Sequence, residues 1–214
     1  MVAGRRLARV DPGGTVVLTG AVQRGRWGSV TPTFGRVSDV SCPGCRLVLP
    51  RGGSAASRPG VDASPECLEL DGRLTATVLQ HPATLGRWHQ TSVDAYLLQH
   101  VGAATKPLAV NFALNGLYLV LERGWAGTAA RAAHQRLAAR VPREDWVRLE
   151  PPDDVGDVRV LDVVRAGDVT ETAELIQRWG WSVWRAWRHA HEEVRETTVR
   201  RLAGGWPSAG APDA

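Results

Sequence analysis

The chain has 214 residues, 43% of them hydrophobic, and these values suit one globular domain with an ordinary core. The net charge is +4, but basic and acidic residues are interleaved along the chain, which argues against nucleic acid as a partner. No stretch has the apolar length of a signal peptide or a membrane-spanning helix, so we expect no membrane attachment.

Residues 1–38 differ from the rest of the chain, because glycines separate short apolar pairs and neither a helical nor a strand period is sustained. This composition predicts a poorly structured N-terminal extension. The sequence Cys42-Pro-Gly-Cys45 follows and predicts a knuckle-like turn. Ser64-Pro65 then predicts the start of a helix that runs to about Gln80, with Ser64 as its N-cap.

The segment 88–100, WHQTSVDAYLLQH, has the highest density of polar and titratable side chains. On a helix, His89 and His100 would share one face, about 16 Å apart along the axis, so they could not bind the same ion. Thr91 and Asp94 have the spacing of a capping box, which would place His89 just outside the first turn. An alternative role for both histidines is hydrogen bonding within a packed interface.

Further helices are predicted at about 107–123 and 128–139, followed by a long loop over 142–155. The segment 158–164 has features of both a strand and a helix. A capping box at Asp168 and Glu171 predicts the start of a long amphipathic helix that stops at 204–205 and has one face lined by tryptophans, for which core packing is the expected role.

These elements together predict a mainly α protein: a single-domain helical bundle of four to five helices over residues 39–204. The bundle would begin with the CxxC knuckle, and residues 205–214 would form a flexible tail. The loosely structured extension at 1–38 would precede it.

The CxxC motif is the most specific chemical signal. Two thiolates three residues apart can bind one ion, and Cys67 lies at a predicted helix N-terminus, where the helix dipole favours a thiolate. A structural zinc site needs four ligands, so the predicted set is Cys42, Cys45, Cys67 and His89. An odd number of cysteines without an export signal also predicts reduced thiols and a cytoplasmic location. Two alternatives are a redox-active pair, although no βαβ pattern accompanies it, and three inert cysteines.

A catalytic alternative uses other polar side chains. His100, Asp94 and His191, with Glu122, would meet inside the bundle and bind a metal with one open position, which would suit a hydrolase. No established catalytic motif supports this reading. A third alternative is a protein-interaction module whose tryptophans face a protein partner.

Six motifs, in this order, resemble the DUF5946 family of bacterial proteins of unknown function: CPGC at 42–45, ASPEC at 63–67, HQTSVDAYLLQH at 89–100, LYLVLERG at 117–124, LEPP at 149–152, and SVWRAW with the following H..VR within 182–195. The resemblance covers residues 41–200 and implies no activity. It places the following residues on motif positions: Cys42, Cys45, Cys67, His89, Asp94, Tyr96, Gln99, His100, Glu122, Trp184 and His191. The chain departs from the pattern at Arg46, where a glycine is expected, and at Ala190, where the first of two adjacent histidines is expected.

Overall fold

The computed structural model describes residues 38–52, 55–142 and 145–202, all within one compact unit, Val37–Ala214. The extension predicted at 1–38, apart from Ser38, and the tail predicted at 205–214 lie outside these residues. The predicted domain boundaries therefore stay predictions.

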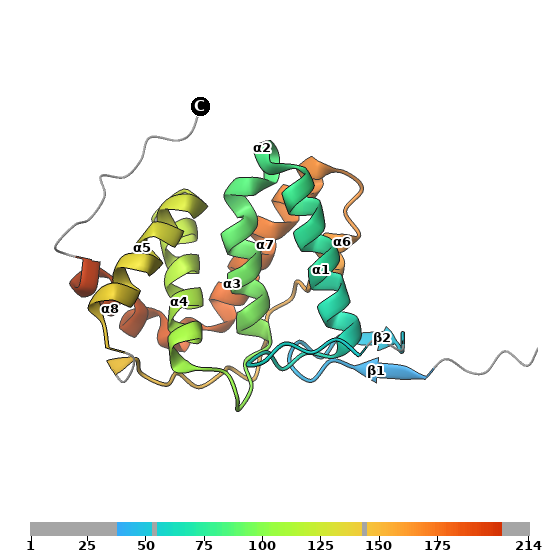
Figure 1. The fold of residues 1–214 in the computed structure, drawn as a ribbon, viewed down its shortest axis with the longest axis horizontal. Coiled ribbons are helices and arrows are strands. Elements are labelled where there is room, and N and C mark those ends of the chain that lie inside the picture. Colours follow the sequence, from blue (N-terminus) through green and yellow to red (C-terminus); the bar gives the residue numbers. More distant parts are fainter. Residues whose placement is uncertain (1–37, 53–54, 143–144, 203–214) are drawn as a thin grey trace, which may run out of the picture. The chain divides into compact units, whose positions relative to one another are not determined.

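The prediction of a mainly α protein is confirmed (Figure 1). Within the described part of the chain, six helices have eleven or more residues: α1 (Pro65–Gln80), α3 (His89–Gln99), α4 (Pro107–Leu117), α5 (Gly127–Arg140), α7 (Val169–Ala186) and α8 (His191–Leu202). The shorter ones are α2 (Pro82–Leu85), the 3-10 turns η1 (Gly86–Trp88) and η4 (Arg188–Ala190), the π-helix η2 (Tyr118–Glu122) and α6 (Val160–Val164). The segment that had features of both a strand and a helix is therefore helical from Val160 onward.

The CPGC turn lies between two short strands, β1 (Asp39–Ser41) and β2 (Val48–Pro50). They pair in antiparallel fashion, with Val40 opposite Leu49. The resulting hairpin holds both ends of the turn, so the knuckle has a fixed frame. In Figure 1 the hairpin lies beside the N-terminal end of α1.

Two of the predicted helix starts agree with the structure and one does not. The Ser64 hydroxyl accepts a hydrogen bond from the Cys67 N–H at 3.2 Å, as an N-cap does. Asp168 likewise accepts from the Glu171 N–H at 2.8 Å. The capping box at Thr91 and Asp94 is wrong, because α3 begins at His89 directly after η1 and has no side-chain cap.

The segment predicted as one C-terminal helix is two helices, α7 and α8, separated by η4. The break leaves carbonyls at the end of α7 without the partners that a continuing helix would supply. His191 gives one of them a second partner, since its Nε2 donates at 2.8 Å to the Trp184 carbonyl, which also accepts from the Trp187 N–H at 3.1 Å. The imidazole also stacks on the Trp184 indole, with ring centroids 3.8 Å apart. His191 therefore stabilises the break.

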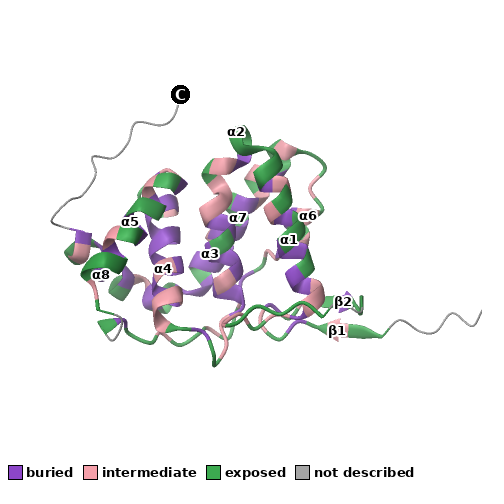
Figure 2. Cartoon of the chain, viewed as in Figure 1, coloured by how far each residue is buried: buried purple, intermediate pink, exposed green. Residues whose placement is uncertain are grey.

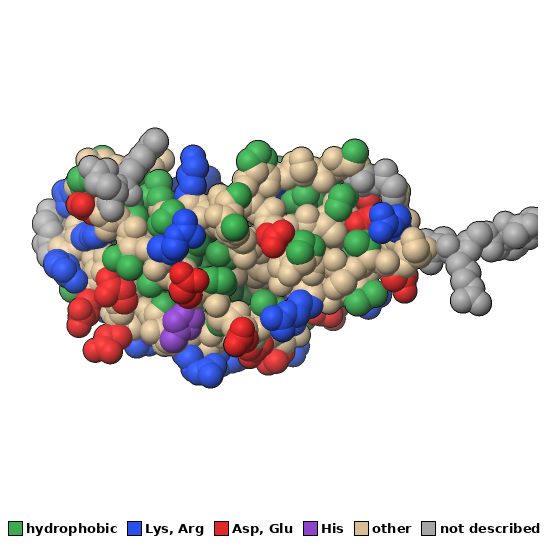
Figure 3. All heavy atoms as spheres, turned by 90° about the horizontal axis from the view of Figure 1, so that it is seen from below, with side chains coloured by type: hydrophobic (Ala, Val, Ile, Leu, Met, Phe, Trp, Pro, Cys, Tyr) green, Lys and Arg blue, Asp and Glu red, His purple; other side chains and the backbone are tan. Residues whose placement is uncertain are grey.

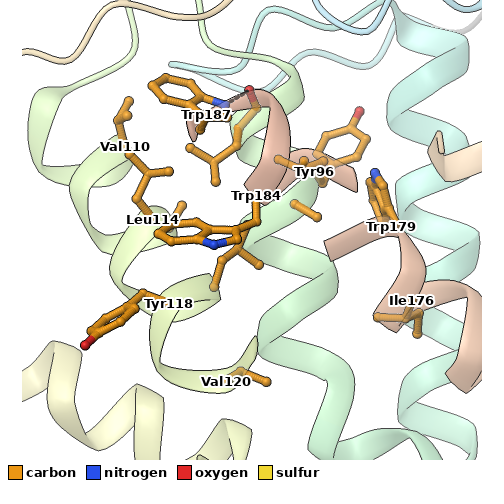
Figure 4. Packing of buried hydrophobic residues seen from close by; sticks show 14 of the residues in the cluster. Tyr96, Val110, Leu114, Tyr118, Val120, Ile176, Trp179, Trp184 and Trp187 are labelled. Carbon is orange, nitrogen blue, oxygen red and sulfur yellow. Dashed lines mark hydrogen bonds between the residues drawn. The ribbon is translucent and has the colours of Figure 1, made fainter. Parts of the chain in front are cut away.

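Helix α3 lies in the middle of the bundle, between α1 on one side and α4 on the other, and α7 packs against it (Figure 1). Its buried surface and that of α7 form much of the core (Figure 2). Trp179, Trp184 and Trp187 are each at most 1% exposed. The Trp187 indole N–H donates to the Leu98 carbonyl at 3.4 Å (Figure 4).

The predicted core role of the tryptophans is confirmed for the part of the chain that the structure describes. All seven tryptophans there are buried or half-buried: Trp88, Trp125, Trp146, Trp179, Trp181, Trp184 and Trp187. A partner surface made of exposed indoles is therefore not found among these residues.

No helix among the described residues combines the length and the apolar content needed to cross a membrane. On the face drawn in Figure 3, basic and acidic side chains of these residues are interspersed. The expectations about nucleic-acid and protein partners stay predictions.

Candidate metal centre

Four side chains from three separate segments meet at one buried point: Cys42, Cys45, Cys67 and His100. Their donor atoms all lie within 4.8 Å of one another, and each residue is at most 1% exposed. The Sγ atoms of Cys45 and Cys67 are 3.7 Å apart, and Cys67 Sγ is 3.3 Å from His100 Nε2. All three cysteines are free thiols. Four soft or borderline donors around one point could hold a metal ion.

The knuckle presents its two thiols through backbone contacts. The Cys42 N–H donates to the Leu47 carbonyl at 2.8 Å, and the Arg46 N–H donates back to the Cys42 carbonyl at 2.9 Å. Gly44 lies against the end of α3, where a Cβ would be 2.7 Å from the Cα of His100. Only glycine lets the turn approach α3 so closely.

Arg46, the position at which a glycine was expected, has a φ of 63°. Left-handed backbone of this kind is costly for a residue with a Cβ and free of that cost for glycine. The departure from the family pattern therefore falls at a position where the backbone geometry favours glycine. The arginine side chain is exposed, so the cost is confined to the backbone.

The third thiol comes from the first turn of α1. Ser64 caps this helix, and its own N–H donates to Cys42 Sγ at 3.4 Å. The cap thus joins the helix to the knuckle. Contact with Cys42 and Cys45, and then burial, raises the pKa of Cys67. This shift is opposite in direction to the one expected from the helix dipole. The same contacts, from Cys45 first and Cys67 second, lower the pKa of Cys42.

His100 follows the last residue of α3, and its two ring nitrogens have different roles. Nδ1 lies 2.6 Å from the Tyr96 carbonyl, which can only accept, so Nδ1 carries a proton and Nε2 faces the thiols. Burial lowers the pKa of His100, but the contacts with Cys42 and Cys45 outweigh it and raise the pKa to about 9. The thiols therefore favour the protonated imidazole, and a metal ion bound at Nε2 would displace that proton.

The fourth member of the cluster is His100, not the predicted His89. Helix α1 carries the chain about 20 Å away from Cys67, and α3 runs back alongside it after the short α2 and η1 (Figure 1). The C-terminal end of α3 returns to the knuckle, whereas His89 begins α3 at the far end. His89 and His100 lie at opposite ends of α3, too far apart to share an ion, and it is His100 that lies beside the thiols.

The three residues proposed as catalytic lie at different places. His100 belongs to the cluster, and His191 is paired with Trp184 at the break between α7 and α8. Asp94 accepts from Gln90 Nε2 at 2.8 Å on another side of α3. Glu122, the fourth residue of that alternative, accepts from the indole N–H of Trp184 at 2.9 Å and pairs with Arg195 at 2.5 Å.

An arginine distant in sequence supports the knuckle and was not predicted. Arg159 Nε donates to the Cys45 carbonyl at 2.9 Å, across 114 positions of the chain. The neighbouring backbone is held in turn by Gln99, whose Nε2 donates to the carbonyls of Val155 and Val158 at 2.7 and 2.8 Å. No local pattern marks Arg159, because its partner is a backbone carbonyl that any residue could supply.

The model of a protein family of unknown function, DUF5946, matches residues 40–188. The chain belongs to the DUF5946 family. The matched range of DUF5946 includes all four residues of the cluster, and α8 with His191 lies beyond it. Neither the curated proteins nor the solved structures include a match to this DUF5946 chain.

Proposed function

We propose that this DUF5946 protein binds one zinc ion through Cys42, Cys45, Cys67 and His100, and that the ion has a structural role. The observation that carries the proposal is the convergence of four buried donor atoms within 4.8 Å. A cytoplasmic location, where the three thiols stay reduced, goes with it.

Zinc fits the spacing of the donors. With Zn–S bonds of about 2.3 Å and Zn–N bonds of about 2.0–2.1 Å, a tetrahedral site has S–S separations of about 3.8 Å and S–N separations of about 3.6 Å. The Cys45–Cys67 and Cys67–His100 separations are 3.7 and 3.3 Å. Three thiolates and one imidazole are also a standard structural zinc set.

A structural role follows from the closure of the site. All four positions of a tetrahedral ion would be taken by protein atoms, and none of the four residues is more than 1% exposed. A catalytic zinc needs one position for water or substrate. An ion at this point would instead join the β1–β2 hairpin to α1 and to the end of α3.

Elemental analysis of the full chain, purified without added metal, tests the proposal. We expect about one zinc per chain, and we expect chelation to lower the thermal midpoint strongly. Replacing Cys42 and Cys45 together with serine should remove the zinc. A folded, metal-free protein, or zinc that persists in the double variant, would show the proposal to be wrong.

A further inference from the structure

All four residues of the candidate metal centre are at most 1% exposed. An ion can therefore enter or leave only when a segment that covers the centre moves. Residues 58–63, which lead from the hairpin toward α1, form neither a helix nor a strand and run past the C-terminal end of α3 (Figure 1). We call this segment the strap.

The strap contacts both the knuckle and the end of α3. The Asp62 N–H donates to the His100 carbonyl at 2.8 Å. The Asp62 carbonyl lies against the knuckle, since a Cβ on Gly44 would be 2.6 Å from it. Directly after the strap, the Ser64 N–H donates to Cys42 Sγ at 3.4 Å. The backbone of the strap is therefore part of the wall that closes the centre.

Arg58 fastens the outer end of the strap. Its Nη2 donates to Asp71 Oδ2 of α1 at 2.6 Å, and its guanidinium lies over the Tyr96 ring, 5.7 Å from the centroid. Tyr96 in turn stacks on the His100 imidazole, with ring centroids 4.1 Å apart. The Asp71 side chain is 9% exposed and the Arg58 side chain 50%. Because the guanidinium already reaches solvent, the Arg58–Asp71 pair is a clasp that can open without burying a charge.

A cleft of about 310 Å³ separates the strap from the loop that follows His100, with residues 60–62 as one wall and 102–105 as the other. A hydrogen bond from Thr105 Oγ1 to the Gly60 carbonyl, at 2.7 Å, crosses it. The second wall is closed on itself, because the Thr105 N–H donates to the Gly102 carbonyl and the Gly102 N–H to Thr105 Oγ1, both at 2.9 Å. Helices α3 and α4 hold that wall at both ends, whereas the strap is attached to a helix only at Ser64. The strap is therefore the wall that can move.

We propose that the strap and the Arg58–Asp71 clasp control the exchange of the zinc ion, which passes through the cleft between residues 60–62 and 102–105. This proposal rests on the zinc site proposed above. When the clasp opens, the strap turns about Ser64, which its hydrogen bond from the Cys67 N–H holds in place, and the bond between Asp62 and His100 breaks. The clasp contains no metal ligand, so it stabilises the closed state with and without the ion. Its loss therefore speeds entry and release alike and leaves the affinity nearly unchanged.

The test measures the rate at which the full-length, zinc-loaded protein transfers zinc to a saturating chromophoric chelator. We expect Arg58→Ala to raise this rate about tenfold, as for the loss of one hydrogen bond between charged groups. The double variant Arg58→Ala/Asp71→Asn should be no faster, because the two residues act as one clasp. Arg200→Ala is the matched control, since it removes an arginine from the exposed Glu196–Arg200 pair of α8 and should leave the rate unchanged.

Hydrogen exchange of backbone amides gives a second readout, which involves no chelator. We expect the Asp62 amide to exchange about tenfold faster in Arg58→Ala, in step with zinc transfer. The Cys42 amide, which donates to the Leu47 carbonyl within the hairpin, should exchange as in the wild type. Equal acceleration at both amides would show general loosening of the fold and would overturn the proposal.

Two further outcomes would also overturn it. One is an Arg58→Ala protein that transfers zinc at the wild-type rate. The other is a loss of equilibrium zinc affinity as large as the gain in transfer rate, which would mean that Arg58 holds a ligand in position. Zinc content is measured first, because a wild-type protein without zinc would overturn the zinc proposal itself, and this one with it.

Discussion

His100 Nδ1 lies 2.6 Å from the carbonyl of Tyr96, one helical turn earlier in α3. This bond fixes the ring so that Nε2 points at the thiols, and it uses a carbonyl that the end of the helix would otherwise leave unpaired. The same contact thus caps α3 and orients the imidazole of the four-residue cluster. A histidine elsewhere on the same face of α3 would lack both the position and the orientation.

Replacing His100 should therefore weaken zinc binding far more than replacing His89. Loss of a residue that only holds a metal ligand in position lowers affinity by roughly 10–100-fold. We expect His100→Ala to lower zinc affinity by more than this, because the proposed ligand itself is removed. His89→Ala is the matched control and should keep about one zinc per chain. Competition with a chromophoric chelator measures both affinities. Equal losses in the two variants would contradict the assignment of the fourth ligand.

Arg46→Gly should stabilise the protein. The φ of 63° costs a residue with a Cβ about 1–2 kcal/mol, while glycine adds about 0.4–1 kcal/mol of unfolded-state entropy. The net gain of about 1 kcal/mol corresponds to a rise in the thermal midpoint of about 2–4 °C for a chain of this size. Arg51→Gly is the control: Arg51 is also exposed, and Arg46 alone among the described non-glycine residues has positive φ. The control should lower the midpoint, and a fall in both variants would contradict the backbone argument.

The parts of the site that sequence could predict are those set by local chemistry. Ser64 and Pro65 mark the start of α1 because capping depends on residues only a few positions apart. The CxxC turn likewise brings two thiols together by itself. Cys67 joins them in the structure, as expected for a thiol in a capped first turn beside the knuckle.

The parts of the site that the sequence could not predict depend on the direction in which α3 packs against α1. His89 and His100 share a helical face, so periodicity does not distinguish them, and only the antiparallel path of α1 and α3 selects His100. Treating neighbouring helices with a short connection as antiparallel would have placed His100 rather than His89 beside the three cysteines. The break after Ala186 was missed because the apolar period continues across it, and the contact of His191 with Trp184 appears only once the helix has ended.

Arg159→Gln should lower zinc affinity by about 10–100-fold, the usual effect of losing a residue that holds a metal ligand in position. Arg159 Nε donates to the Cys45 carbonyl at 2.9 Å, so its loss frees the backbone that aims one thiol. Arg165→Gln is the control, since Arg165 is exposed at the other end of α6. Chelator competition on both variants measures the difference. Unchanged affinity in Arg159→Gln would show that the hairpin alone positions Cys45.

Gly116→Ala should destabilise the protein and Gly72→Ala should stabilise it. Alanine is favoured over glycine in a helix interior by about 1 kcal/mol, and at position 72 a Cβ meets nothing within 4 Å. At position 116 the new methyl group would lie 2.0 Å from Asp94 Oδ2. Overpacking of this kind should lower the free energy of unfolding by about 1–3 kcal/mol. Urea unfolding of the zinc-loaded proteins measures both. A gain in stability at both positions would show that the Asp94 side chain can move aside freely.

Acidification should destabilise the protein partly through His134. Its pKa is about 4 in the folded protein, against about 6.5 in an unfolded chain. Between these values the unfolded chain binds a proton that the folded protein does not, so this contribution is complete above about pH 6.5 and is lost toward pH 4. From pH 7 to pH 5 we expect the free energy of unfolding to fall by about 2 kcal/mol more in the wild type than in His134→Phe.

Asp94 should act in the opposite direction and provides the internal control. Burial raises its pKa in the folded protein, so the folded state binds a proton more readily than the unfolded chain and gains relative stability as the pH falls. Asp94→Asn removes this gain, and its free energy of unfolding should therefore fall more steeply with acid than that of the wild type. Zinc release affects all three proteins alike, so the differences between their pH profiles isolate the two residues. Parallel profiles for the wild type and His134→Phe would mean that His134 titrates normally and is reached by solvent in the folded protein.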